Sequence, residues 1–102
     1  MKKIIDGKIY NTETAEYLGD YQYSYPSDFS YYYEKLYRTK KGTFFLYGEG
    51  NAASPYAHHC SYGGYDPGTG FKVLTEIEAR EWVEEHLFTD DYSYIFGEPE
   101  EG

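Results

Sequence analysis

Tyrosine is the residue that most constrains what this chain can fold into. The 102 residues include 15 tyrosines, but only 18 leucine, isoleucine, valine and phenylalanine residues together. So few aliphatic side chains and a formal net charge of −9 usually indicate disorder. Tyrosine favours folding instead, because its large ring can be buried while its hydroxyl group stays at a solvated edge. We therefore predict one folded domain over residues 1–102, built on an antiparallel, tyrosine-rich sheet of about four or five strands.

Turn residues predict β-hairpins within residues 1–48. Asp6-Gly7 separates two short β-prone stretches, and both positions tolerate the positive φ angles of a two-residue turn. Lys40-Lys41-Gly42 separates the strands predicted over 31–37 and 43–47, which form the central hairpin. Alternating tyrosines over 15–25 predict a further strand, with a bend at Gly19-Asp20.

Residues 49–70 are predicted to form a flexible loop, because they are rich in glycine, serine, proline and asparagine without a sustained period. This segment contains His58-His59-Cys60, the one cluster of residue types that bind transition metals. Adjacent histidines point in different directions, and no spaced second cysteine completes a tetrahedral set. We predict neither a metal site nor a cofactor.

The C-terminal part of the chain predicts an acidic helical segment over 75–96. Thr75 and Glu78 match a capping box at the start of a helix, after a short strand at 72–74. The apolar stripe of this amphipathic helix consists of Ala79, Trp82, Val83, His86 and Leu87. A second short helical turn follows over 90–96, and 97–102 form a tail. Together with the sheet, this gives an α+β fold.

The formal charge of the protein is concentrated in its last quarter. Residues 75–102 hold ten carboxylates against one base, Arg80, whereas residues 1–74 hold eight acids and eight bases. Such a segment repels nucleic acids and membranes and attracts basic protein surfaces. We predict that its outer face binds a basic, nucleic-acid-binding protein through Glu78, Glu81, Glu84, Glu85, Asp90 and Asp91. The alternative is a face that only solubilises the protein.

Sequence motifs do not indicate an enzyme. The chain has no GxSxG motif, P-loop or dinucleotide fingerprint, and carboxylates on an exposed helix are ordinarily solvated. Tyrosines can stack on single-stranded bases, but that role needs a basic groove, and only Lys35, Arg38, Lys40 and Lys41 cluster in the sequence. We expect no direct contact with nucleic acid. Exposed tyrosines would instead add area to a protein interface.

The cellular compartment is predicted from two further features. A single cysteine, Cys60, excludes an intrachain disulfide and fits a reducing environment. We also expect no leader peptide, because the first residues lack a basic-then-apolar pattern, and no apolar run approaches the ~18 residues that cross a membrane. Both features indicate the cytoplasm.

Several stretches of the sequence resemble small acidic proteins of bacterial mobile elements. They are MKKIIDGKIYNTETA (1–15), FFLYGEG (44–50) and the pattern of residues 74–87 and 94–98. Some proteins of that group are anti-CRISPR proteins that act on Cas9. The resemblance implies a stoichiometric inhibitor that hinders guide RNA loading or DNA binding, with no catalytic residue to carry over. An acidic protein suits this role, because Cas9 holds its guide and target in positively charged channels.

Two alternatives remain open at this point. One is an acidic antitoxin, or another inhibitor of a nucleic-acid enzyme. The other is a small metal-dependent nuclease that acts on the guide RNA and is built on His58, His59 and carboxylates.

Overall fold

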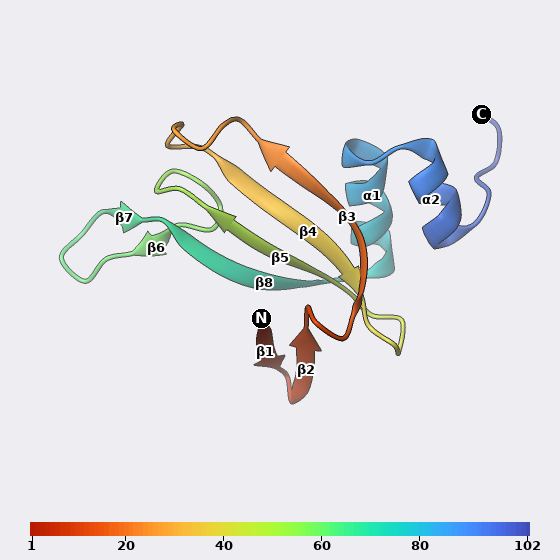
Figure 1. Cartoon of the computed structure of the whole chain (residues 1–102), viewed down its shortest axis with the longest axis horizontal. Helices are drawn as coiled ribbons and strands as arrows, with labels where there is room; N and C mark the ends of the chain where they lie inside the picture. Colours follow the sequence, from red (N-terminus) through yellow and green to blue (C-terminus); the bar gives the residue numbers. More distant parts are fainter.

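The computed structural model describes residues 1–102 and consists of a twisted sheet, two small hairpins and two C-terminal helices (Figure 1). The strands are β1 (Lys2–Ile5), β2 (Lys8–Asn11), β3 (Glu16–Tyr23), β4 (Tyr32–Arg38), β5 (Phe44–Gly50), β6 (His58–His59), β7 (Tyr65–Asp66) and β8 (Gly68–Leu74). The helices are α1 (Glu76–His86) and α2 (Thr89–Phe96). This arrangement confirms the predicted α+β class with an antiparallel sheet and a C-terminal helix.

The main sheet has four antiparallel strands in the order β3-β4-β5-β8. The predicted central hairpin is confirmed, since β4 pairs with β5 and places Leu36 opposite Leu46. The register of β3 against β4 shifts between Tyr17 and Gly19, next to the position where a bend was predicted at Gly19-Asp20. Successive side chains of each strand point to opposite sides, so the sheet has one helix-covered face and one face turned away from the helices.

The helix-covered face holds the larger core. Its buried residues are Leu36, Phe44, Leu46, Leu74, Ala79, Trp82, Val83 and Ile95. The predicted capping box is present, and the buried residues of α1 belong to the predicted apolar stripe. Helix α2 follows α1 after two residues and adds Ile95 to the core. The C-terminal helices therefore attach to the sheet by the pattern that the sequence indicates.

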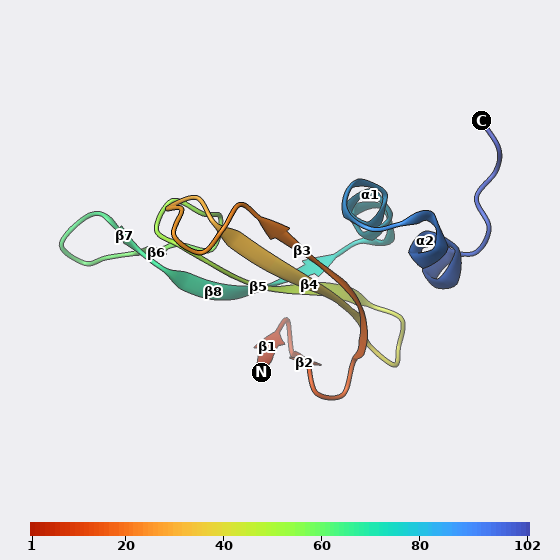
Figure 2. The ribbon, with the colours of Figure 1, turned by 45° about the horizontal axis from the view of Figure 1, so that its top comes forward.

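The N-terminal hairpin covers part of the opposite face, so this end of the molecule has three layers (Figure 2). It turns at Asp6-Gly7 with φ angles of 51° and 76°, as predicted. Tyr10 is buried and packs edge-on against Phe45, whose ring stacks on Tyr37. The hairpin forms a separate two-stranded sheet and does not extend the main one.

The segment 49–70, predicted as a flexible loop, contains more secondary structure than expected. It includes the end of β5, the β6–β7 hairpin and the start of β8. Tyr56 anchors it, because its ring lies over Gly48 and Gly70, where a side chain on Gly48 would overlap the ring. The glycines that suggested a loop instead make a flat surface on paired strands.

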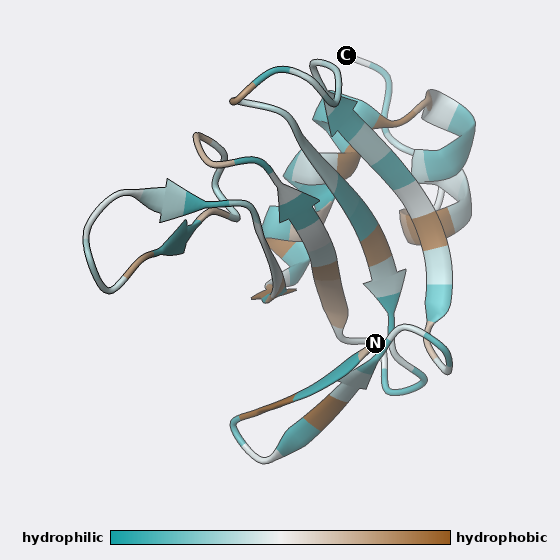
Figure 3. Cartoon of the chain, turned by 60° about the vertical axis from the view of Figure 1, so that its left-hand side comes forward, coloured by the Kyte–Doolittle hydropathy of each residue, from teal (hydrophilic) through white to brown (hydrophobic).

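The residues of the strands are hydrophilic to weakly apolar on the hydropathy scale along much of the sheet (Figure 3). Hydrophobic colours are confined to short stretches, because tyrosine scores as hydrophilic on this scale even where its ring is packed. Helix α2 ends at Phe96, and residues 97–102 contain neither helix nor strand. None of the helices is long and apolar enough to cross a membrane.

Candidate functional site

The predicted partner-binding carboxylates lie along α1 and α2, and none of them is buried. Glu81, Glu84, Glu85 and Asp90 are exposed, and we call these four residues the acidic face. The other two predicted residues, Glu78 and Asp91, also lie on these helices but have local partners. Of the six predicted residues, four therefore remain free to bind a partner and two are engaged within the protein.

Glu78 and Asp91 stabilise helix starts. Glu78 accepts a hydrogen bond from the Thr75 N–H at 2.9 Å, and this bond lowers the pKa of its carboxyl group. Asp91 accepts the Phe88 N–H at 3.1 Å. Both interactions satisfy amides that have no partner within the helix. The charge pattern alone did not separate these capping residues from the rest.

The acidic face has little positive charge beside it. Arg80, the only base of residues 75–102, forms a salt bridge with Glu76 at 3.1 Å and donates a hydrogen bond to the Tyr92 hydroxyl group at 2.9 Å. Its guanidinium group also lies over the ring of Phe96. His86 is 3.6 Å from Glu85 and neutralises that carboxylate only when protonated. The negative charge of this surface is therefore largely uncompensated within the protein.

Two large apolar side chains accompany the carboxylates. Ile77 is 69% exposed and Phe88 is 83% exposed. Ile77, Glu81 and Glu84 follow helical spacing and form one stripe on the outside of α1, whereas Phe88 lies after the end of this helix, in the extended connection to α2. Phe88 also borders a pocket of about 250 Å³ between α1, α2 and the tail. Ile77 and Phe88 were not predicted as binding residues, although their positions off the buried stripe indicate exposure.

Glu34 is a further carboxylate that the sequence analysis did not single out. It lies on the helix-covered face of β4 and accepts the Trp82 indole N–H at 3.0 Å and the Tyr56 hydroxyl at 2.5 Å. Burial and this hydrogen bond raise the pKa of Tyr56. Glu34 thus joins three parts of the molecule: the sheet, α1 and segment 49–70. Its role is structural.

Many of the tyrosine rings are engaged in contacts within the protein. On the helix-covered face, Tyr21 stacks on His86 at 3.8 Å, and Tyr23 stacks on Tyr32 at 5.2 Å. The tyrosines that remain well exposed are Tyr17, Tyr23, Tyr25, Tyr62, Tyr65 and Tyr94. Only these rings present substantial area to a partner.

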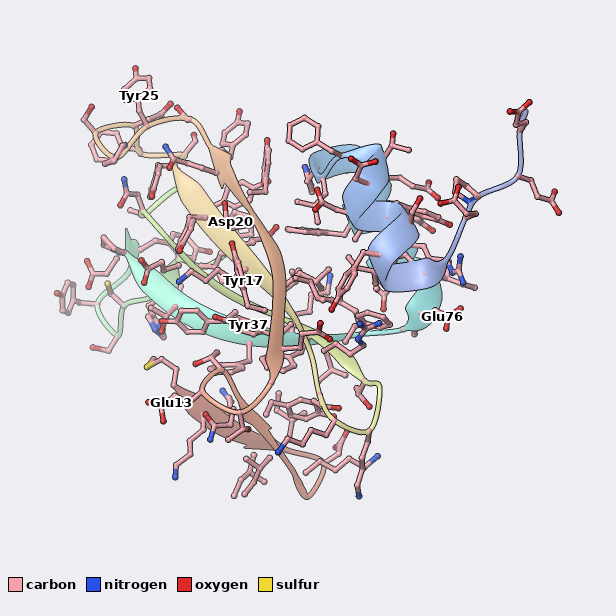
Figure 4. The ribbon with its side chains drawn as sticks, turned by 45° about the vertical axis from the view of Figure 1, so that its right-hand side comes forward. Glu13, Tyr17, Asp20, Tyr25, Tyr37 and Glu76 are labelled. Atoms are coloured by element: carbon pink, nitrogen blue, oxygen red, sulfur yellow. The ribbon has the colours of Figure 1, made fainter.

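On the opposite face, Tyr17, Asp20 and Tyr37 lie close to one another (Figure 4). The Tyr17 hydroxyl donates a hydrogen bond to Asp20, and burial together with this bond raises the pKa of Tyr17. Asp20 is therefore occupied by a neighbour on its own strand. Glu76, by contrast, projects from the start of α1 on the other side of the molecule (Figure 4).

The histidine and cysteine residues do not assemble into a metal centre. No group of three or more histidine, cysteine, aspartate or glutamate side chains is placed to hold a metal ion. His58 and His59 form the short strand β6, whereas His86 lies on α1 against Tyr21. The Cys60 thiol donates a hydrogen bond to Asp66 at 3.0 Å, which raises its pKa. The thiol is thereby held in its less reactive, protonated form.

Comparison with protein-family models, curated proteins and solved structures finds no match to this chain.

Proposed function

We propose that this protein is a stoichiometric inhibitor of a Cas9-type effector. Its acidic face would bind a basic surface of the effector and hinder guide RNA loading or DNA binding. The observation that carries the proposal is the set of four exposed carboxylates on adjoining helices, with no lysine or arginine paired to any of them. Channels that hold nucleic acid present the complementary charge.

The exposed apolar residues give this face a means of binding beyond charge. Charged rim contacts mainly accelerate and orient association, whereas buried aromatic and aliphatic side chains supply much of the affinity of an interface. Ile77 and Phe88 lie beside Glu81 and Glu84, where a partner that covers the carboxylates also covers them. The stripe thus combines both kinds of contact.

Gel filtration with Cas9, run with and without preloaded guide RNA at low and moderate salt, tests the proposal. Co-elution only without guide would support competition for the RNA-binding channel. Co-elution in both cases would support a block at DNA binding. Absence of co-elution in both, with no inhibition of cleavage, would reject this effector as the partner and favour a different nucleic-acid enzyme or toxin.

Charge reversal identifies the surface involved. Glu81→Lys, Glu84→Lys and Glu85→Lys in one variant should abolish binding while the melting temperature stays close to that of the parent, because these side chains make no core contacts. The matched control reverses Glu98, Glu100 and Glu101 in the tail, which changes the net charge equally. If the two variants lose binding to the same extent, only the overall charge matters and the assigned surface is wrong.

Stoichiometry separates inhibition from the nuclease alternative. A binding inhibitor reaches its endpoint at a fixed ratio to the effector and leaves the guide RNA intact. A nuclease would shorten the guide at substoichiometric amounts and would stop when a chelator is added. Intact guide RNA on a denaturing gel, at full inhibition, is the expected result.

A further inference from the structure

A second charged region lies between the N-terminal hairpin and the turn that joins β4 to β5. These two segments, far apart in the sequence, enclose a pocket of about 490 Å³. Lys8 comes from β2, and Lys40 and Lys41 come from the turn. One part of the lining is fixed, because Tyr10 is buried against Phe45. The three lysine side chains are exposed and extend from this backbone framework.

The charge in this pocket is positive and unpaired. No aspartate or glutamate lines it, although Asp6 and Glu13 are sequence neighbours of lining residues. The salt bridges of the protein involve Arg38, Arg80 and His86, and none involves a lysine. Three lysine residues line this one pocket, and like charges that come close together repel one another unless an anion lies between them.

The adjoining carboxylate is already occupied. Glu16 borders a neighbouring hollow that shares Thr39 and Lys40 with the pocket. It forms a salt bridge with Arg38 at 2.9 Å and accepts the Tyr94 hydroxyl at 2.5 Å. These two bonds lower the pKa of Glu16 and hold its carboxylate away from the lysines. The protein thus supplies no internal counter-ion for the pocket.

The hydroxyl groups of Thr39 and Thr43 add hydrogen-bond donors to the lysines of the pocket. Thr39 Oγ1 accepts the Thr43 N–H at 3.1 Å, which leaves its own proton free to donate. Thr43 also lines the pocket. Lysine ammonium groups and hydroxyls are donors that suit phosphate oxygens, with lysine acting as a compact point charge. The volume exceeds what one phosphate group fills, and three cations match more than one negative charge.

We infer that this pocket, lined by Lys8, Lys40 and Lys41, binds a ligand with two or more linked phosphate groups. Such phosphates occur in a free polyphosphate and along a nucleic-acid backbone, and the two sources share this chemistry. The hairpin that supplies Lys8 lies on the other side of the sheet from the helices (Figure 2), and no residue of α1 or α2 lines the pocket, so the inference does not depend on the proposed inhibition.

Two probes and two variants test this inference. Tripolyphosphate binding is measured by calorimetry, and binding of a fluorescent single-stranded RNA by anisotropy, both at physiological ionic strength, where the screening length of about 8 Å limits repulsion from the acidic helices. The pocket variant carries Lys8→Gln, Lys40→Gln and Lys41→Gln. The control carries Lys2→Gln, Lys3→Gln and Lys72→Gln, which makes the same charge change outside the pocket.

The affinity of the pocket variant for the probe that the parent binds should be at least about tenfold lower than that of the parent, and the affinity of the control should stay within about threefold. For RNA, three phosphate contacts predict a slope of about −2 for log K against log salt, which the pocket variant loses. Binding of tripolyphosphate alone supports a free polyphosphate as ligand, and binding of RNA alone supports a backbone. Absence of binding to both probes, or equal binding by both variants, would overturn the inference.

Discussion

Gly48→Ala should destabilise the protein strongly, because the glycine makes room for the Tyr56 ring. A Cβ atom at position 48 would overlap the Cζ atom of that ring, so the ring has to move. Its hydroxyl then loses the 2.5 Å hydrogen bond to Glu34. The ring lies over both strands, since a Cβ atom added to Gly70 on β8 would lie 3.4 Å from its other edge.

The expected cost follows from three contributions. Overpacking typically costs about 1–3 kcal/mol, and loss of a hydrogen bond to a charged group costs about 1.5–3 kcal/mol. Replacing glycine by alanine restricts the unfolded chain and returns about 0.4–1 kcal/mol. The net loss is roughly 1.5–5.5 kcal/mol, and its central value of about 3.5 kcal/mol lowers the melting temperature of a domain of this size by about 14–28 °C.

A double-mutant cycle with Tyr56→Ala tests the cause. In the Tyr56→Ala background the overlap is gone, so Gly48→Ala should cost close to nothing in urea unfolding followed by Trp82 fluorescence. Gly70→Ala is the matched control, because its Cβ atom would lie 3.4 Å from the same ring, an ordinary contact. An equal cost of Gly48→Ala in both backgrounds would refute the reasoning, as would a similar loss from Gly70→Ala.

Two other predictions concern helix capping and pH. Thr75→Ala should lower the unfolding free energy by about 1 kcal/mol, because it removes the hydroxyl group that accepts the Glu78 N–H. Thr89→Ala, at the first residue of α2, is the control and should have little effect. Equal shifts in melting temperature for the two variants would contradict the capping role of Thr75. The raised pKa of Tyr56 predicts that stability is retained below pH 10, the ordinary value, and declines as the pH rises further, since the unfolded chain releases a phenol proton that the folded protein holds. Urea midpoints between pH 8 and 11 should fall less steeply for Tyr56→Phe than for the parent, and identical slopes would show that Tyr56 is not responsible.

The sequence indicated those parts of the fold that depend on neighbouring residues. Asp6-Gly7 and Lys40-Lys41-Gly42 marked two turns, and the spacing of Thr75 and Glu78 marked the start of α1. Each signal lies within a few positions, so local backbone chemistry is sufficient to read it.

Contacts between distant residues were not predictable in the same way. Glu34 binds Tyr56 and Trp82, which are 22 and 48 positions away, and no local pattern links them. Gly70 was assigned to the loop predicted over 49–70, because its use with Gly48 as a surface for a ring appears only when the two strands pair. A signal was present in the repeated glycine spacing of GEG (48–50) and GTG (68–70), which face each other in the sheet.

The candidate site was predictable in outline, because a charge count along the chain is enough to locate an acidic helical segment. Which carboxylates are free depends on the hydrogen bonds of the folded state. The capping pattern gave a reason to set Glu78 apart, but the bond from the Phe88 N–H to Asp91 requires the short connection between α1 and α2 to be known.

The layered arrangement of charge makes the folded protein an electric dipole whose axis crosses the sheet. Lysines of the hairpin lie on one side, and the helices with their carboxylates lie on the other. Near a cationic surface this dipole produces a torque that turns the helices forward before contact, which selects one orientation during diffusion and makes the association rate sensitive to salt. Once the molecule has docked by its helices, the side left facing the solvent is the one that carries the lysines.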